Sequence, residues 1–152
     1  MNFSPTQKEK MLFQDQKKHE EVCVQKYKSY AQSAQDPQLK QLFNSLSQKE
    51  QQHLNSINQL LSGQVPQLQG QAQQGQQTMS SALQGSNNSH DAGLLNDMLM
   101  TEKYVSGTYD TAIFESQDAN VRQVLNHIQK EEQQHGEEIF NYMKNSGMYN
   151  PQ

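Results

Sequence analysis

One short motif, Glu-x-x-His, occurs twice in this chain, at residues 50–53 and again at residues 132–135. The two copies are 82 residues apart, and the same offset relates Glu20 to Glu102. On a helix, residues three positions apart lie on one face, so each motif presents a carboxylate and an imidazole together. Such a repeat constrains the fold strongly, because equivalent segments are expected to form equivalent structural units.

The repeat extends over whole helix hairpins. The alignment needs no gap from Glu20 to Ile57. Its matched pairs are Tyr27 with Tyr109, Gln35 with Gln117, Asp36 with Asp118, Leu39 with Val121, Gln41 with Gln123, Asn44 with Asn126 and Ile57 with Ile139. The sequence therefore predicts two copies of one helix–helix hairpin, each carrying a Glu, then a Tyr, then Glu-x-x-His.

The composition is unusually polar for a folded domain. Hydrophobic residues make up 32% of the sequence and the mean hydropathy is −1.01, values that are typical of disordered chains. Regular three- and four-residue spacing of apolar side chains nevertheless predicts helices for most of the chain, except its Gln-, Gly- and Ser-rich middle. At 152 residues, we expect a single domain, 1–152.

Charge and hydropathy argue against several classes of protein. The net charge of −4 disfavours binding to a nucleic-acid backbone, and no apolar run approaches the roughly 20 residues of a membrane span. Residues 1–10 contain no apolar signal core, so we expect cytoplasmic synthesis without a signal peptide. The single Cys23 cannot form an internal disulfide, which fits a reducing compartment.

Capping residues and apolar spacing predict four helices, at about residues 5–34, 37–62, 91–117 and 119–145. Ser4 and Gln7 are suited to a capping box, and Asp36 and Asp118 to capping the second and fourth helices. Short loops make neighbouring helices antiparallel, while residues 63–90 form one long crossover. The predicted fold class is an all-α, antiparallel four-helix bundle with that crossover between helices 2 and 3.

Each predicted apolar stripe also contains residues of the kind that bind metals. Glu20 and Glu102 lie in the inward stripes of the first and third helices, and the two motifs lie within the apolar faces of the others. Burying an unpaired carboxylate costs several kcal/mol, so each carboxylate needs a cation or a proton. The six candidate metal ligands are Glu20, Glu50, His53, Glu102, Glu132 and His135.

Four carboxylates with two imidazoles suit two ions of Fe or Mn. Di-iron and di-manganese bundles take one Glu from each of two helices and Glu-x-x-His from the other two. In that arrangement Glu50 and Glu132 would bridge two ions ~3.5–4 Å apart. Glu20 and Glu102 would be terminal ligands, and each His would complete the coordination of one ion. Two other interpretations stay open: a solvated polar face, and a relic site whose members hydrogen-bond to one another.

Tyr27 and Tyr109 follow Glu20 and Glu102 by seven residues, which is two helical turns. Buried Tyr hydroxyls seek acceptors, so each Tyr would either support a ligating carboxylate across the bundle or fill the core. Without metal, carboxylates packed together in a buried site are expected to raise one another's pKa. Cys23, about one turn from Glu20, is interpreted as a small core residue.

Three further residues of the fourth helix stand out. His127 and Glu131, four positions apart, are expected to form a surface pair. Gly136 interrupts this helix where Leu54 stands in the first copy. Glycine is costly inside a helix, and close approach by a neighbour would explain its presence.

The order Glu, Glu-x-x-His, Glu, Glu-x-x-His over two hairpins resembles the ferritin-like superfamily across most of the chain. A second resemblance, to the Coat F family of spore-coat proteins from spore-forming bacteria, is carried by NDML at 96–99, RQVL at 122–125 and NYMKNSGMYNP at 141–151. The ending Tyr-Met-x-x-x-Gly-x-Tyr-x-Pro is its most telling signature. The resemblance implies a ferritin-like fold and a place in or near the spore coat, and it implies no known enzyme activity.

Two functions are open at this point. The first is oxygen chemistry at a di-metal site, either oxidation of Fe(II) or dismutation of peroxide in the manner of a manganese catalase. The second is a structural coat protein whose metal ions hold the bundle together, or which keeps only a relic site. Expected partners are other spore coat proteins or further copies of this chain.

Overall fold

The computed structural model describes residues 1–68 and 88–151. Four helices dominate these residues: α1 (Gln7–Ser33), α2 (Pro37–Leu61), α3 (Ser89–Glu115) and α4 (Ala119–Asn145). They confirm the predicted all-α four-helix bundle. Most of the expected crossover, from 69 to 87, lies outside the described residues. None of the four helices is long and apolar enough to cross a membrane.

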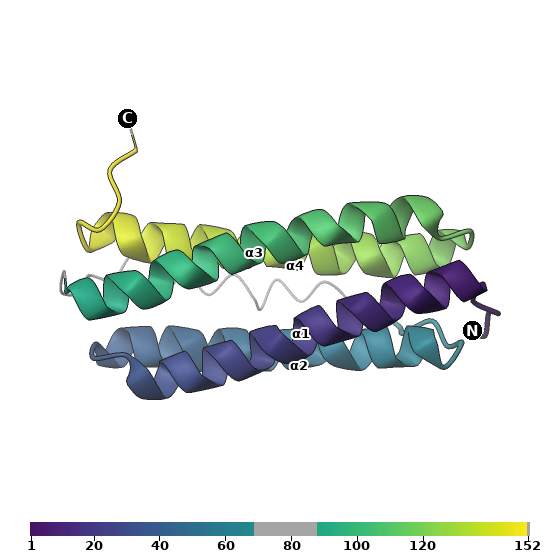
Figure 1. Cartoon of the computed structure of the whole chain (residues 1–152), viewed down its shortest axis with the longest axis horizontal. Helices are drawn as coiled ribbons and strands as arrows, with labels where there is room; N and C mark the ends of the chain where they lie inside the picture. The colour runs from purple at the N-terminus through teal and green to yellow at the C-terminus, as the bar shows by residue number, and fades with distance from the viewer. Residues whose placement is uncertain (69–87, 152) are drawn as a thin grey trace.

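Helices that follow one another within each half of the chain are antiparallel partners. α1 packs on α2 and α3 packs on α4, and the two hairpins lie one against the other (Figure 1). Gln16 bonds to Thr108 while Gln35 bonds to Asp91, so α1 and α3 also run antiparallel. The end of α2 and the start of α3 lie at opposite ends of the bundle (Figure 1), as a crossover requires.

Side-chain caps fix the starts of the helices. Asp36 and Asp118 cap α2 and α4, as predicted, by accepting hydrogen bonds from backbone N–H groups of the first turn. The cap of α1 is Thr6 and not Ser4, so the predicted start was two residues too early. Thr6 accepts from the backbone N–H of Glu9, whose carboxylate accepts from the Thr6 N–H, and this reciprocal pair sets where α1 begins.

Two buried carboxylates connect the hairpins at their corners. Glu9 of α1 accepts a hydrogen bond from the backbone N–H of Gln117, at 2.9 Å, in the loop between α3 and α4. Asp91 of α3 accepts from the backbone N–H groups of Gln35 and Asp36, at 2.9 and 3.0 Å, in the loop between α1 and α2. Glu9 and Asp91 are related by the 82-residue offset, so the repeat reaches nearly to the helix starts.

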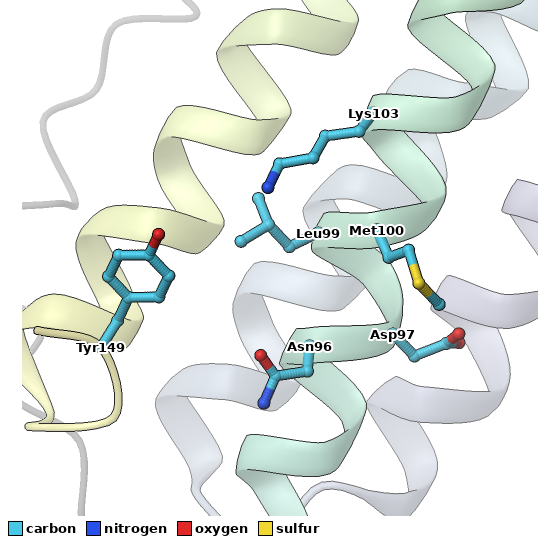
Figure 2. A pocket seen from close by; sticks show the side chains of 6 residues that line it. All are labelled: Asn96, Asp97, Leu99, Met100, Lys103 and Tyr149. Carbon is cyan, nitrogen blue, oxygen red and sulfur yellow. The ribbon is translucent and has the colours of Figure 1, made fainter. Parts of the chain in front are cut away.

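The chain after α4 turns back over the second hairpin. Gly147, with φ of 72°, adopts the left-handed conformation that ends the helix, and Met148 then packs against the core. The Tyr149 ring meets Phe140 edge-on, with centroids 5.1 Å apart. Tyr149 also lines a pocket with Leu99 of α3, and the two side chains point into the space between the helices (Figure 2).

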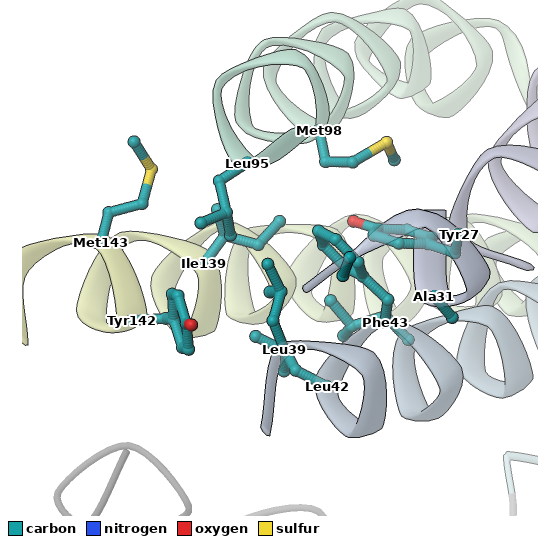
Figure 3. Packing of buried hydrophobic residues seen from close by; sticks show 12 residues of the cluster. Tyr27, Ala31, Leu39, Leu42, Phe43, Leu95, Met98, Ile139, Tyr142 and Met143 are labelled. Atoms are coloured by element: carbon teal, nitrogen blue, oxygen red, sulfur yellow. The ribbon is translucent and has the colours of Figure 1, made fainter. Parts of the chain in front are cut away.

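The hydrophobic core consists of two clusters, each built from all four helices. The first contains Tyr27, Ala31, Ala34, Leu39, Leu42, Phe43, Leu46, Leu95, Met98, Ile139, Tyr142 and Met143 (Figure 3). The second contains Phe13, Cys23, Ile57, Leu60, Val105, Tyr109, Ala112, Val121, Val124, Leu125 and Ile128. Along α2, α3 and α4 the predicted ligands fall between these two clusters, so apolar packing covers both ends of the polar centre.

Removing Asp91 tests the corner contacts. We expect Asp91→Ala to lower the free energy of unfolding by about 1–3 kcal/mol at neutral pH, because two backbone donors lose their acceptor. Burial raises the pKa of Asp91, but the hydrogen bonds from Gln35 and Asp36 outweigh it and lower the pKa. Its stabilisation is therefore present above the unfolded pKa of ~3.9 and is lost as pH falls through the lower folded value.

Urea unfolding at neutral pH and near pH 3 measures both effects. The difference between parent and Asp91→Ala should be large at neutral pH and should shrink in acid. Asp15→Ala, which removes an exposed carboxylate of α1, should change the stability by less than about 0.5 kcal/mol. Equal losses in the two variants would contradict a role for Asp91 in joining the hairpins.

Candidate metal centre

Six carboxylate and imidazole side chains meet at the middle of the bundle. They are Glu20 of α1, Glu50 and His53 of α2, Glu102 of α3, and Glu132 and His135 of α4. Each is at most 4% exposed. The structure thus brings together all six candidate ligands, and the interpretation as a solvated polar face is wrong.

The six residues form two overlapping groups of four. One group is Glu20, Glu50, His53 and Glu132, and the other is Glu50, Glu102, Glu132 and His135. Within each group, one ligand atom from every residue lies within 4.8 Å of the others. Glu50 and Glu132 belong to both groups. These two carboxylates are therefore placed to be shared between two ions, and the other four residues to serve one ion each.

Both imidazoles turn Nδ1 toward the carboxylates. His53 Nδ1 lies 3.0 Å from Glu132 Oε1 and 3.2 Å from Glu50 Oε2. His135 Nδ1 lies 2.9 Å from Glu50 Oε1. The two rings stack with centroids 5.5 Å apart and an interplanar angle of 17°. In both histidines, Nδ1 is therefore the candidate ligand atom, and it faces the shared carboxylates.

Tyr27 and Tyr109 hold the two unshared carboxylates. The Tyr27 hydroxyl donates to Glu102 Oε1 and the Tyr109 hydroxyl donates to Glu20 Oε1, both at 2.5 Å. Burial, followed by the charge of the bonded carboxylate, raises the pKa of each hydroxyl well above its usual value. Both therefore stay protonated and act as donors. Each Tyr reaches across to the other hairpin, so these bonds join the two copies of the repeat while they orient the site.

Three of the carboxylates each keep one buried oxygen that has no hydrogen-bond partner among the described residues. These atoms are Oε2 of Glu20, Glu102 and Glu132. Leaving a buried polar atom unpaired costs about 1–3 kcal/mol, and more for a charged group. In a relic site, protons shared between neighbouring carboxyl groups would have to satisfy these oxygens. Cations bound among them would satisfy them as well, so the residues fit a metal site.

The site carboxylates do not all titrate alike. Burial and then the charge of Glu50 raise the pKa of Glu20, and burial and then the charge of Glu20 raise that of Glu132. For Glu50, hydrogen bonds with Glu20, His135 and His53 outweigh burial and lower the pKa. The expectation of a raised pKa is therefore wrong for Glu50. It is the acceptor that both imidazoles share, and this favours its ionised form.

A chain of contacts leads from His53 toward the surface. His53 Nε2 lies 3.1 Å from Glu131 Oε1, which lies 3.0 Å from His127 Nε2. Burial raises the pKa of Glu131, but the hydrogen bond and charge of His53 lower it to about 2. The expected pair of His127 and Glu131 is present. That Glu131 also contacts His53 of the site was not predicted from the sequence. The repeat places Lys49 at the position equivalent to Glu131, so this support is not duplicated.

Cys23 is buried in the second core cluster, as expected for a small core residue. Burial, and then the charge of nearby Glu50, raises the pKa of its thiol. The sulfur is therefore held as a neutral thiol, and Cys23 belongs to the packing around the site and not to the candidate ligands.

The hydrogen bonds of the site lead to a test in metal-free protein. Glu50→Gln should lower the free energy of unfolding by about 3 kcal/mol, because it removes the negative charge that contacts both buried imidazoles. Glu20→Gln should cost less than about 1 kcal/mol, since an amide reproduces the neutral carboxyl that the raised pKa favours. Chemical unfolding in EDTA measures both. Glu21→Gln, at an exposed position of α1, should match the parent, and the opposite order of Glu20 and Glu50 would contradict this charge arrangement.

Comparison with known proteins identifies the second hairpin. Residues 90–152 match the Coat F domain. Searches of curated proteins and of solved structures gave no match. The matched residues include Glu102, Glu132 and His135 and the whole Tyr-Met-x-x-x-Gly-x-Tyr-x-Pro ending. The comparison therefore confirms the resemblance seen in the sequence, over α3, α4 and the C-terminal tail of this chain.

Proposed function

We propose that this protein is a spore-coat-associated, ferritin-like bundle that holds two ions of Fe or Mn between its hairpins. Its place in the coat is supported by the Coat F domain over residues 90–152. Metal binding is supported by one observation above the others: two groups of four buried ligands that share Glu50 and Glu132. Other coat proteins, or further copies of this chain, are its proposed partners.

The charges and donor atoms favour divalent cations. The two groups contain four carboxylates and two imidazole nitrogens in a site closed by apolar clusters at both ends. Oxygen and imidazole ligands without thiolate suit Fe or Mn. The Oε2 atoms of Glu20, Glu102 and Glu132, which accept no hydrogen bond among the described residues, supply further acceptors for such ions. Two divalent ions would balance the charge of four ionised carboxylates.

Each residue has a role in such a site. Glu50 and Glu132 would bridge the ions, Glu20 with His53 would hold one, and Glu102 with His135 would hold the other. Tyr27 and Tyr109 would fix the orientation of the unshared carboxylates. When bound, Fe or Mn would supply redox and Lewis-acid chemistry. Both imidazoles must be neutral to bind a cation, so loading releases protons and weakens as the pH falls.

Metal bound here would also stabilise the bundle. Each group of four takes ligands from both hairpins: Glu132 joins the ligands of the first hairpin, and Glu50 joins those of the second. An ion in either group would therefore hold α1–α2 against α3–α4. Such a role needs no turnover, and it suits a protein whose function is to build a durable coat.

A second candidate function is oxidation of Fe(II) or removal of peroxide at the same two ions. A groove between α3 and α4 is lined by Glu102 and Glu132, and this observation favours it. Turnover of peroxide, or oxidation of added Fe(II), by metal-loaded protein would support the enzyme. Stoichiometric metal without turnover would support the structural role.

Metal stoichiometry tests the proposal itself. After reloading with Mn(II), the parent should hold about two ions per chain, as in other four-helix carboxylate sites. His53→Ala should lose one ion because His53 belongs to one group, whereas Glu50→Ala should lose both because Glu50 belongs to both groups. Elemental analysis after desalting gives the count.

Thermal unfolding with and without Mn(II) gives the linked stability. Saturation at a hundredfold excess over the dissociation constant should add about 2.7 kcal/mol for each filled site. His90→Ala, a histidine outside both groups, should keep both ions and the full stabilisation. A parent protein that binds no metal and shows no shift would refute the di-metal proposal and leave a purely structural coat protein with a relic site.

Glu131 offers a finer test, because it contacts the outer nitrogen of only one candidate ligand. Carboxylates that accept from a ligating imidazole fix its orientation, and their loss typically weakens metal affinity about 10–100-fold. Glu131→Gln should therefore weaken one of the two ions and spare the other in a calorimetric titration with Mn(II). Lys49→Gln, at the equivalent position of the first hairpin, should weaken neither. Equal weakening of both ions by Glu131→Gln would contradict the assignment of His53 to a single ion.

A further inference from the structure

A groove of about 620 Å³ lies between α3 and α4. Glu102 and Glu132 of the candidate metal centre are among its lining residues. Both carry a buried Oε2 atom with no hydrogen-bond partner among the described residues. The floor of the groove is therefore formed in part by two residues of the candidate site, whose side chains are at most 2% exposed.

Two glycines of the groove have no packing explanation. Gly107 lies within α3 and Gly136 within α4, where glycine is among the least favourable residues. A Cβ atom at Gly107 would meet no described atom within 4 Å, and at Gly136 it would meet only Leu99 Cδ1 at 4.0 Å, an ordinary contact. The close approach expected at Gly136 is therefore absent among the described residues, and neither glycine has a positive φ.

The repeat shows what these glycines replace. The first hairpin has Gln25 at the position equivalent to Gly107 and Leu54 at the position equivalent to Gly136. Side chains are thus present on the α1–α2 face where the α3–α4 face has none. The two hairpins agree in their ligands and tyrosines and differ here, so the absence of side chains is a property of the groove and not of the fold.

We propose that this groove is the port through which divalent cations enter the metal centre, an inference that rests on the proposed function. Besides Glu102 and Glu132, the groove is lined by two carboxylates, Asp110 and Glu137, and by one cationic side chain, Lys103. The two core clusters close the ends of the site. The groove adjoins a second pocket of about 510 Å³ at the C-terminal tail, and both are lined by Leu99, Lys103 and Tyr149 (Figure 2).

Introducing the equivalent side chains of the first hairpin at the two glycines should block the port. Gly107→Gln and Gly136→Leu, singly and together, are mixed with Co(II) in a stopped-flow instrument after removal of metal. The visible absorption of Co(II) changes when carboxylate and imidazole replace water. We expect the double variant to take up Co(II) at least about tenfold more slowly, with unchanged final stoichiometry and a higher melting temperature, because both substitutions favour the helix.

Gly93→Gln is the matched control. Gly93 is an exposed glycine of α3 outside the groove, and a Cβ atom there would also meet no described atom within 4 Å. This variant should take up Co(II) at the parent rate. A double variant that binds Co(II) fully and at the parent rate would overturn the port and leave the proposed function intact. A parent that binds no Co(II) at equilibrium would overturn the proposed function, and the port with it.

Discussion

The burial of four carboxylates and two imidazoles at the centre of the bundle is the constraint on which the rest of this structure depends. Each charged group must be paired, protonated or bound to a cation to remain there. The tyrosines and imidazoles meet part of that need, by donating to Glu20, Glu102 and Glu50. Apolar clusters then cover both ends of this polar layer. The core is divided in two because this polar layer occupies its middle.

Reciprocal contacts join the two hairpins. Tyr27 and Tyr109 each reach across to a carboxylate of the other hairpin, and Glu9 and Asp91 each bond to the other hairpin's loop. Each hairpin also supplies three of the six buried candidate ligands. The segment that matches the Coat F domain, residues 90–152, therefore contains only three of the six candidate ligands, and the other three lie outside it.

Local patterns made the helices and the six central residues predictable. Helix periodicity reports which face is buried, and the 82-residue offset reports that the two halves share one design. Contacts across the bundle were harder to predict from the sequence. The bond from Asp91 to the other hairpin, and the support that Glu131 gives to His53, depend on how the hairpins dock. The lowered pKa of Glu50 was mispredicted for the same reason, since the sign depends on which neighbour donates to it and not on burial alone.

Differences between the two halves of the repeat carry information that their agreement does not. Glu131 contacts His53, the imidazole of the first hairpin. The residue equivalent to Glu131 in the first hairpin is Lys49, so the repeat provides no matching carboxylate for His135. The glycines at 107 and 136 lie beside Glu102 and Glu132 in the groove, on the side of the second hairpin. The two groups of four ligands are therefore chemically unequal although their ligands match. One has a better supported imidazole, and the other lies nearer the groove, so an ion entering there would meet the second group first.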